Sequence, residues 1–218
     1  MRNDLPAVFD PALSDVSFPL AAISYEQAEK LFTFFKYHPL FNWDGANNGC
    51  EGRADAVCVL MDELNIPNYK AWVFSGWYLK KNAGQLKNYW NYHVAPLLAV
   101  ENNGEILYYV LDPSTAGSLL LIDEWAAAIT VFPYTYYFIR QSHWYIFPAK
   151  DLHFRKWHTR NKRNRKWMIQ SLAGINGLSA IGKAKLTFNK TQLKNREKAF
   201  EIARKQMSLS QITPVLSA

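Results

Sequence analysis

The chain has 218 residues, of which 49% are hydrophobic and 15% aromatic, so it can form one domain with a sizeable core, with or without an appendage. It contains no run of 18 apolar residues, which excludes a membrane-spanning helix, and its two cysteines exclude a disulfide framework. The net charge of +7 is uneven: residues 1–151 carry 10 basic and 16 acidic side chains, whereas residues 152–218 carry 15 and 2.

The first two thirds of the chain mix helical and strand patterns. Residues 1–22 contain three prolines and little periodicity, which predicts an extended arm. Ser24 and Gln27 then form a capping-box signature at the start of a helix. One face of that helix is apolar, with Ala28, Leu31, Phe32 and Phe35. Further along, the patterns predict a helix from Cys50 to about Asn65, strands over 70–78, 89–100 and 105–112, a short helix from Asp123 to Thr130, and one or two strands within 134–147.

Cys50 is predicted to begin its helix. Asn47, Asn48 and Gly49 provide the preceding turn, and apolar residues then recur at helical spacing: Ala54, Val57, Cys58, Met61 and Leu64. A thiol at a helix N-terminus lies at the positive end of the helix dipole, which lowers its pKa and favours the nucleophilic thiolate. The alternative is that Cys50 is a small, inert buried residue.

A histidine and an aspartate are predicted to meet on the following hairpin. A hairpin loop centred between the two asparagines of the Glu-Asn-Asn-Gly turn pairs Val100 with Glu105, and the same register places His93 opposite Asp112. Opposed residues share a sheet face with Cβ atoms about 5 Å apart. A carboxylate beside an imidazole selects its tautomer and supports its charged form. Pro96 indicates an edge or a bulge, and a bulge would shift this register.

These residues resemble a known family. Gly49-Cys50, Tyr92-His93-Val94-Ala95 and Leu111-Asp112-Pro113-Ser114 are similar, in order and spacing, to motifs of bacterial protein-glutaminases. The Arg53-Ala54 pair and the Lys70-Ala71-Trp72 strand are similar as well. The family is a branch of the transglutaminase-like cysteine enzymes. Its known members are secreted with a signal and a pro-segment and are rich in cysteine, whereas this sequence has two cysteines and is expected to have neither a signal nor a pro-segment.

The resemblance, over residues 24–118, implies hydrolysis of the side-chain amide of protein-bound glutamine, which gives glutamate and ammonia. It implies Cys50 as the nucleophile, His93 as the general base and acid, and Asp112 as the carboxylate that orients the histidine. Further candidates are Asn47 and Asn48 for the oxyanion hole, and Trp43, Trp90 and Tyr92 as walls for a glutamine side chain.

The expected fold is α+β, with a papain-like or transglutaminase-like core in which the cysteine helix packs on an antiparallel sheet. Residues 1–22 form the arm, residues 23–150 the catalytic domain and residues 151–218 a basic, largely helical extension. No histidine and cysteine spacing typical of a metal site occurs, and no glycine-rich phosphate loop, so no cofactor is expected.

Three other functions remain open. A transglutaminase uses the same triad with an amine in place of water, and a cysteine protease is a further enzymatic alternative. A non-catalytic binding module would act through the basic extension. Seven basic residues fall within residues 155–166, beside Trp157 and Trp167, and indicate either an anionic partner (protein, lipid surface or nucleic acid) or a face packed on the acidic part of the chain. Residues 191–207 are predicted to form a helix whose apolar stripe packs on the core.

The cysteines also bear on the compartment. If both lie on one helix, Cys50 and Cys58 are about 12 Å apart along its axis, too far for a disulfide. Free thiols and an N-terminus without an apolar signal region predict the bacterial cytoplasm, or export as an effector or toxin without a cleaved signal peptide.

Overall fold

The computed structural model describes residues 7–43, 49–75, 85–87, 90–132, 135–146, 157–159, 162–174 and 189–209. Its helices are α1 (Tyr25–Tyr37), α2 (Cys50–Asp62), α4 (Ile122–Ile129), α5 (Lys162–Leu172), α7 (Lys190–Leu209) and the 3-10 turn η1 (Pro11–Leu13). Its strands are β1 (Ala7–Phe9), β2 (Ala22–Ser24), β3 (Tyr69–Phe74), β4 (Gln85–Leu86), β5 (Tyr92–Asn102), β6 (Glu105–Val110), β7 (Leu120–Leu121), β8 (Thr130–Phe132), β9 (Thr135–Gln141), β10 (Trp144–Ile146) and β11 (Trp157–Thr159). The fold is mixed α+β, as predicted.

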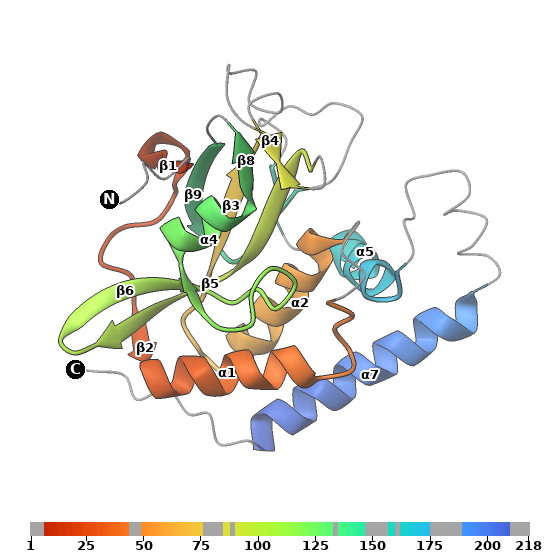
Figure 1. Ribbon diagram of the computed structural model, residues 1–218. Helices are drawn as coiled ribbons and strands as arrows, with labels where there is room; N and C mark the ends of the chain where they lie inside the picture. Colours follow the sequence, from red (N-terminus) through yellow and green to blue (C-terminus); the bar gives the residue numbers. More distant parts are fainter. Residues whose placement is uncertain are drawn as a thin grey trace.

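The strands form one main sheet, in the order β1-β9-β3-β5-β6-β7, with β2 paired to β5 (Figure 1). The contacts of β9 with β3, β3 with β5 and β5 with β6 are antiparallel, whereas the N-terminal strands β1 and β2 join in parallel. The expected arm, residues 1–22, is thus tied into the sheet at two places, because it contains β1 and its last residue, Ala22, begins β2.

The two faces of the sheet are covered by different helices. Leu98 and Val100 of β5 belong to a core cluster with residues of α1, α2, α5 and α7. The alternate residues Leu97 and Ala99 belong to a second cluster with Trp125 and neighbouring residues of α4. Figure 1 shows α1, α2, α5 and α7 gathered on one side, with α7 running beside α1. The period-two alternation of a strand therefore separates two apolar cores.

The helix α1 has the predicted start. Ser24 accepts a hydrogen bond from the backbone N–H of Gln27, and the Gln27 side chain accepts one from the backbone N–H of Ser24. The buried residues are the predicted ones: Ala28, Leu31, Phe32 and Phe35. The capping box at α1 is confirmed. The short helix α4 begins at Ile122, one residue before the predicted start at Asp123, so Asp123 lies in its first turn.

The cysteine helix α2 begins at Cys50, as predicted, and ends at Asp62, before the predicted Asn65. Gly49 precedes it with φ of +96°, a backbone conformation that disfavours any residue with a Cβ. Inside the helix, Asp55 forms a buried ion pair with Lys70 of β3, with a distance of 2.8 Å between Oδ1 and Nζ. Lys70 also donates to the backbone carbonyl of Trp144 at 2.8 Å. This pair fastens α2 to the sheet.

The hairpin between β5 and β6 has a different register from the predicted one. Val100 pairs with Leu107 and Asn102 with Glu105, so the loop is centred one residue later, between Asn103 and Gly104. Both loop residues have positive φ, +54° and +83°, as a two-residue type I′ turn requires. The prediction that His93 lies directly opposite Asp112 in the ladder is therefore wrong. The ladder instead ends where Leu97 pairs with Val110.

The described part of the basic extension packs against the cysteine helix and α1. Phe200, Ala203 and Met207 of α7 are buried in the same core cluster as α1 and α2, which confirms the predicted apolar stripe. In α5, Met168, Ile169 and Leu172 are buried in that cluster. No helix among the described residues is long and apolar enough to cross a membrane.

The contact between α2 and α5 is close because Gly52 has no side chain. A Cβ added at Gly52 would lie 2.3 Å from Cβ and 2.7 Å from Oγ of Ser171, and one at Gly49 would lie 3.2 Å from the same Cβ. The extension therefore abuts the first turn of the cysteine helix, and only small residues permit this approach.

We expect Gly52→Ala to lower the free energy of unfolding by about 1–3 kcal/mol, as overpacking does, although helix propensity alone would favour alanine by about 1 kcal/mol. Urea denaturation measures the change. The double variant Gly52→Ala/Ser171→Gly should be more stable than Gly52→Ala, because it removes the clashing Cβ. Gly117→Ala is the matched control, since an added Cβ there meets nothing within 4 Å. A stabilised Gly52→Ala would contradict the packing.

Candidate active site

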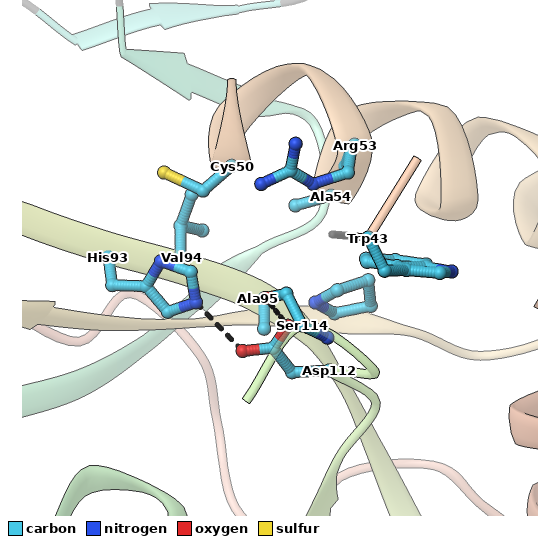
Figure 2. A pocket seen from close by; sticks show the side chains of 10 residues that line it. Trp43, Cys50, Arg53, Ala54, His93, Val94, Ala95, Asp112 and Ser114 are labelled. Atoms are coloured by element: carbon cyan, nitrogen blue, oxygen red, sulfur yellow. Dashed lines mark hydrogen bonds and ion pairs between the residues drawn. The ribbon is translucent and has the colours of Figure 1, made fainter. Parts of the chain in front are cut away.

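Three side chains from different elements line one pocket (Figure 2). Cys50 lies at the first position of α2, His93 lies near the start of β5, and Asp112 follows the end of β6. Because the β5–β6 ladder ends at Leu97 and Val110, the chain after β6 is free to turn beside the first residues of β5. In Figure 2 the His93 ring lies between the Cys50 sulfur and the Asp112 carboxylate.

Asp112 is buried and is held by hydrogen-bond donors only. Its Oδ2 accepts from His93 Nε2 at 2.7 Å, from Thr115 Oγ1 at 2.7 Å and from Trp125 Nε1 at 3.0 Å. Its Oδ1 accepts from the backbone N–H and the hydroxyl of Ser114. Burial by itself would raise the pKa of this carboxyl, but His93, Ser114 and Trp125 together hold the pKa of Asp112 well below its usual range.

The ionised Asp112 determines which nitrogen of His93 can act as a base. Because Asp112 only accepts hydrogen bonds, the proton of a neutral His93 ring lies on Nε2. The other nitrogen, Nδ1, then carries the free lone pair. Aromatic side chains hold the ring: Trp90 stacks on it with centroids 4.6 Å apart and planes at 17°, and Trp125 lies 5.7 Å away. The buried imidazole is therefore fixed in both position and tautomer.

The Cys50 thiol is in a different electrostatic state from the predicted one. Its Sγ donates to Oε2 of Glu51 at 3.4 Å. Burial and the Glu51 carboxylate raise the pKa of Cys50 well above its usual range, against the opposing effects of Arg53 and the backbone of Val94. The prediction of a lowered pKa is therefore wrong for the free protein, because burial and an adjacent anion outweigh the helix N-terminus.

The other predicted site residues lie at different distances from this centre. Trp43 lines the pocket beside Arg53, whose guanidinium lies 5.9 Å from the indole centroid. Trp90 touches the site through the His93 ring. Tyr92 instead packs on Trp72 and Phe74, in the small core beneath the start of β5.

The predicted oxyanion-hole residues Asn47 and Asn48 lie outside the described residues. Among the described residues, no group of histidine, cysteine, aspartate and glutamate could hold a metal ion.

The middle of the chain also matches a family model. The model described as glutaminase matches residues 27–129, a range that contains Cys50, His93 and Asp112. The resemblance to the protein-glutaminase family is confirmed. By sequence, no curated protein matches the chain.

Solved structures similar to this glutaminase-like chain are protein-glutaminases. A crystal structure of protein-glutaminase superposes with a TM-score of 0.53 at 16% identity, covering 70% of this chain and 90% of that one. The NMR structure of protein-glutaminase from Chryseobacterium proteolyticum gives a TM-score of 0.50 at 16% identity, covering 70% and 85%. The A47Q2 mutant of pro-protein-glutaminase superposes with a TM-score of 0.51 at 17% identity, and this chain spans 61% of the length of that protein. These likenesses show a shared fold.

Several residues around this pocket were not found from the sequence. Arg53 was noted only for its resemblance to the family, although it is 5% exposed and lines the pocket. Ser114 and Thr115 had a local signal, because hydroxyl residues just after an aspartate commonly bond back to it. Trp125 had none, since only the packing of α4 under the sheet brings its indole to Asp112. For Glu51 the only signal in the sequence was its position next to Cys50.

We expect Asp112→Asn to lower the free energy of unfolding at pH 7 by about 3 kcal/mol, because it removes a buried charge that four side chains and a backbone N–H stabilise. The folded-state pKa of Asp112 is depressed, so its contribution is complete above the unfolded value of 3.8 and is lost as the pH falls below it. The difference in unfolding free energy between the wild type and Asp112→Asn, measured by urea denaturation, should therefore shrink between pH 4 and pH 3.

Asp15→Asn is the control for this experiment. Asp15 pairs with Arg140 at 3.4 Å in a more exposed setting, with 23% of its side chain exposed. Its loss should cost about 1 kcal/mol or less. A deficit of Asp112→Asn that is equal at pH 3 and pH 7 would contradict the ionised, donor-bonded carboxylate.

Proposed function

We propose that this protein is a protein-glutamine deamidase, which hydrolyses the side-chain amide of protein-bound glutamine to glutamate and ammonia. The observation that carries the proposal is the buried 2.7 Å hydrogen bond between His93 and Asp112, in a pocket that also contains a cysteine at the start of a helix. The match to the glutaminase family model supports the choice of substrate. The neighbours titled protein-glutaminase agree with it.

In the first step, His93 removes the thiol proton of Cys50. The Sγ–H bond breaks, the proton moves to Nδ1 of His93, and the electron pair stays on sulfur. The positive charge that develops on the ring is stabilised by Asp112 at Nε2. In this mechanism the thiolate forms only as the ring takes the proton, which agrees with a thiol whose pKa is raised in the free protein.

The thiolate then attacks the carbonyl carbon of the glutamine amide. The backbone N–H of Cys50 has no acceptor within the helix, because it lies in the first turn, and is free to bind the oxyanion. Asn47 and Asn48 are the further candidates for this role. His93 returns its proton to the amide nitrogen, and the C–N bond breaks with release of ammonia. A water deprotonated by Nδ1 then hydrolyses the thioester, which frees glutamate and restores the thiol.

The same proposal assigns parts of the chain to roles. The helix that begins at Cys50 and the antiparallel strands β3, β5 and β6 correspond to a papain-like or transglutaminase-like core within residues 23–150. Residues 151–218 form the extension, which braces the cysteine helix through α5. Trp43 and Trp90 are the proposed walls for the glutamine side chain. Tyr92 has a structural role instead, because it packs on Trp72 and Phe74.

Cys50→Ala should abolish ammonia release from glutamine-containing proteins while the protein stays folded, because the change removes one sulfur at a half-buried helix start. The measurements are ammonia release, a mass increase of about 1 Da for each converted glutamine, and circular dichroism. Cys58→Ser is the matched control, because Cys58 is buried in the core beside the Tyr69 carbonyl and should keep most of the activity. A Cys50→Ala variant with a tenth of the wild-type rate would exclude Cys50 as the nucleophile.

We also propose that the basic run at residues 155–167 recruits an anionic partner. Arg165 pairs with Glu201 at 3.0 Å and lies over the Phe200 ring, so this cation has an intramolecular role. Replacing Arg160, Lys162, Arg163 and Lys166 by glutamine should spare hydrolysis of a short neutral glutamine peptide. It should slow action on an acidic glutamine-containing protein severalfold, and added salt should have the same effect on the wild type.

The melting temperature distinguishes recruitment from packing. If the four cations only stabilise the fold, the variant should melt at a lower temperature and lose activity on both substrates alike, which would contradict recruitment. Arg165→Gln is the companion variant. It should lower the melting temperature without changing the preference between the two substrates.

A further inference from the structure

Glu51 lies beside the proposed nucleophile and has no part in the mechanism above. It follows Cys50 in the first turn of α2, and its Oε2 lies 3.4 Å from the Cys50 sulfur. A carboxylate in the first helical turn is favourable for the helix itself, because it offsets the positive end of the dipole. For the thiol it has the opposite effect, because it removes the positive potential that would stabilise a thiolate.

The charges around the thiol come from three parts of the fold. On α2 they are Glu51, Arg53 and Asp55; on β5 and after β6 they are His93 and Asp112; on β10 there is Tyr145. Tyr145 is buried, and burial first, with Glu51 and Asp55 next, raises the pKa of its hydroxyl. It is therefore neutral. Two groups here are positively charged: Lys70 of β3, which is paired with Asp55, and Arg53. Figure 2 shows the Cys50 sulfur pointing away from Arg53.

We propose that Glu51 is a positioning residue that keeps Cys50 as a neutral, hydrogen-bonded thiol in the free protein. The inference deepens the proposed function, because the state of Cys50 matters most if Cys50 is the nucleophile. Its consequence is that the thiol is inert until its hydrogen turns from Oε2 of Glu51 to Nδ1 of His93. A neutral thiol is also the form least open to oxidation and alkylation.

The test is the pH dependence of alkylation by iodoacetamide, with mass spectrometry to separate Cys50 from the buried Cys58. It reads the thiol directly and needs no deamidase activity, so it can fail or succeed independently of the proposed function. Glu51→Gln removes the charge and keeps a hydrogen-bond acceptor, whereas Glu51→Ala removes both. Glu63→Gln removes one negative charge at the other end of the same helix, where Glu63 pairs with Arg204, and is the matched control.

Glu51→Gln should lower the midpoint of the Cys50 alkylation profile by about one pH unit, the size expected when an adjacent like charge is removed. At pH 7 the thiolate fraction then rises about tenfold. The rate should rise about threefold, because the nucleophilicity of each thiolate falls with its pKa. Glu51→Ala should shift the midpoint at least as far, and Glu63→Gln should not shift it.

Two results would overturn the proposal. One is a midpoint unchanged in both folded Glu51 variants. The other is an equal shift in Glu63→Gln, which would make the effect one of net charge. If Glu51→Ala alone failed to fold, Glu51→Gln would still decide, because its side chain has nearly the same shape. If the alkylation profile shifts as expected while Cys50→Ala keeps deamidase activity, the proposed function fails and the Glu51 inference stands.

Discussion

The position of the cysteine helix depends on one buried ion pair. Lys70 and Asp55 are each 1% exposed, and their charged atoms are 2.8 Å apart. Taking two charges out of water is costly, and losing either partner would leave the other charge buried, so the pair strongly disfavours any arrangement that separates α2 from β3. Lys70 also donates to the Trp144 carbonyl, which brings β10 to the same point. With this contact in place, the start of α2 and the start of β5 are held at one end of the sheet.

The two ionisable partners of His93 in the proposed triad differ in charge: Asp112 is ionised, whereas Cys50 is a neutral thiol. Asp112 receives hydrogen bonds from His93, Ser114, Thr115 and Trp125, so the folded protein stabilises its charge. Cys50 is half-buried and lies beside Glu51, so the folded protein disfavours its charge. A proton therefore rests on sulfur, and the base that can accept it is already oriented. Such a site is poised for proton transfer without carrying a permanent thiolate.

The predicted hairpin register was wrong, yet the side chains of His93 and Asp112 form a hydrogen bond in the structure. The observed loop is centred one residue later than predicted, which moves the partner of each β5 residue by two positions. Side chains alternate between the faces with a period of two, so a two-residue shift leaves every side chain on its original face. Asp112 then reaches His93 from the turn after β6, outside the ladder. A shift by one residue would have placed it on the other face of the sheet.

The candidates Cys50, His93 and Asp112 came from short motifs that resemble a known family and from a hairpin register that was wrong. Local patterns in the sequence were sufficient for the start of α1, the start of α2 and the apolar stripe of α7. These features follow from backbone preferences and side-chain period, which residues close in sequence determine. The indole of Trp125 on Asp112, the contact of Gly52 with Ser171 and the direction of the Cys50 pKa shift needed the tertiary structure. Each of them depends on burial or on groups brought together from segments far apart in the chain, and a pKa in particular is the sum over all of those groups, which no local pattern contains.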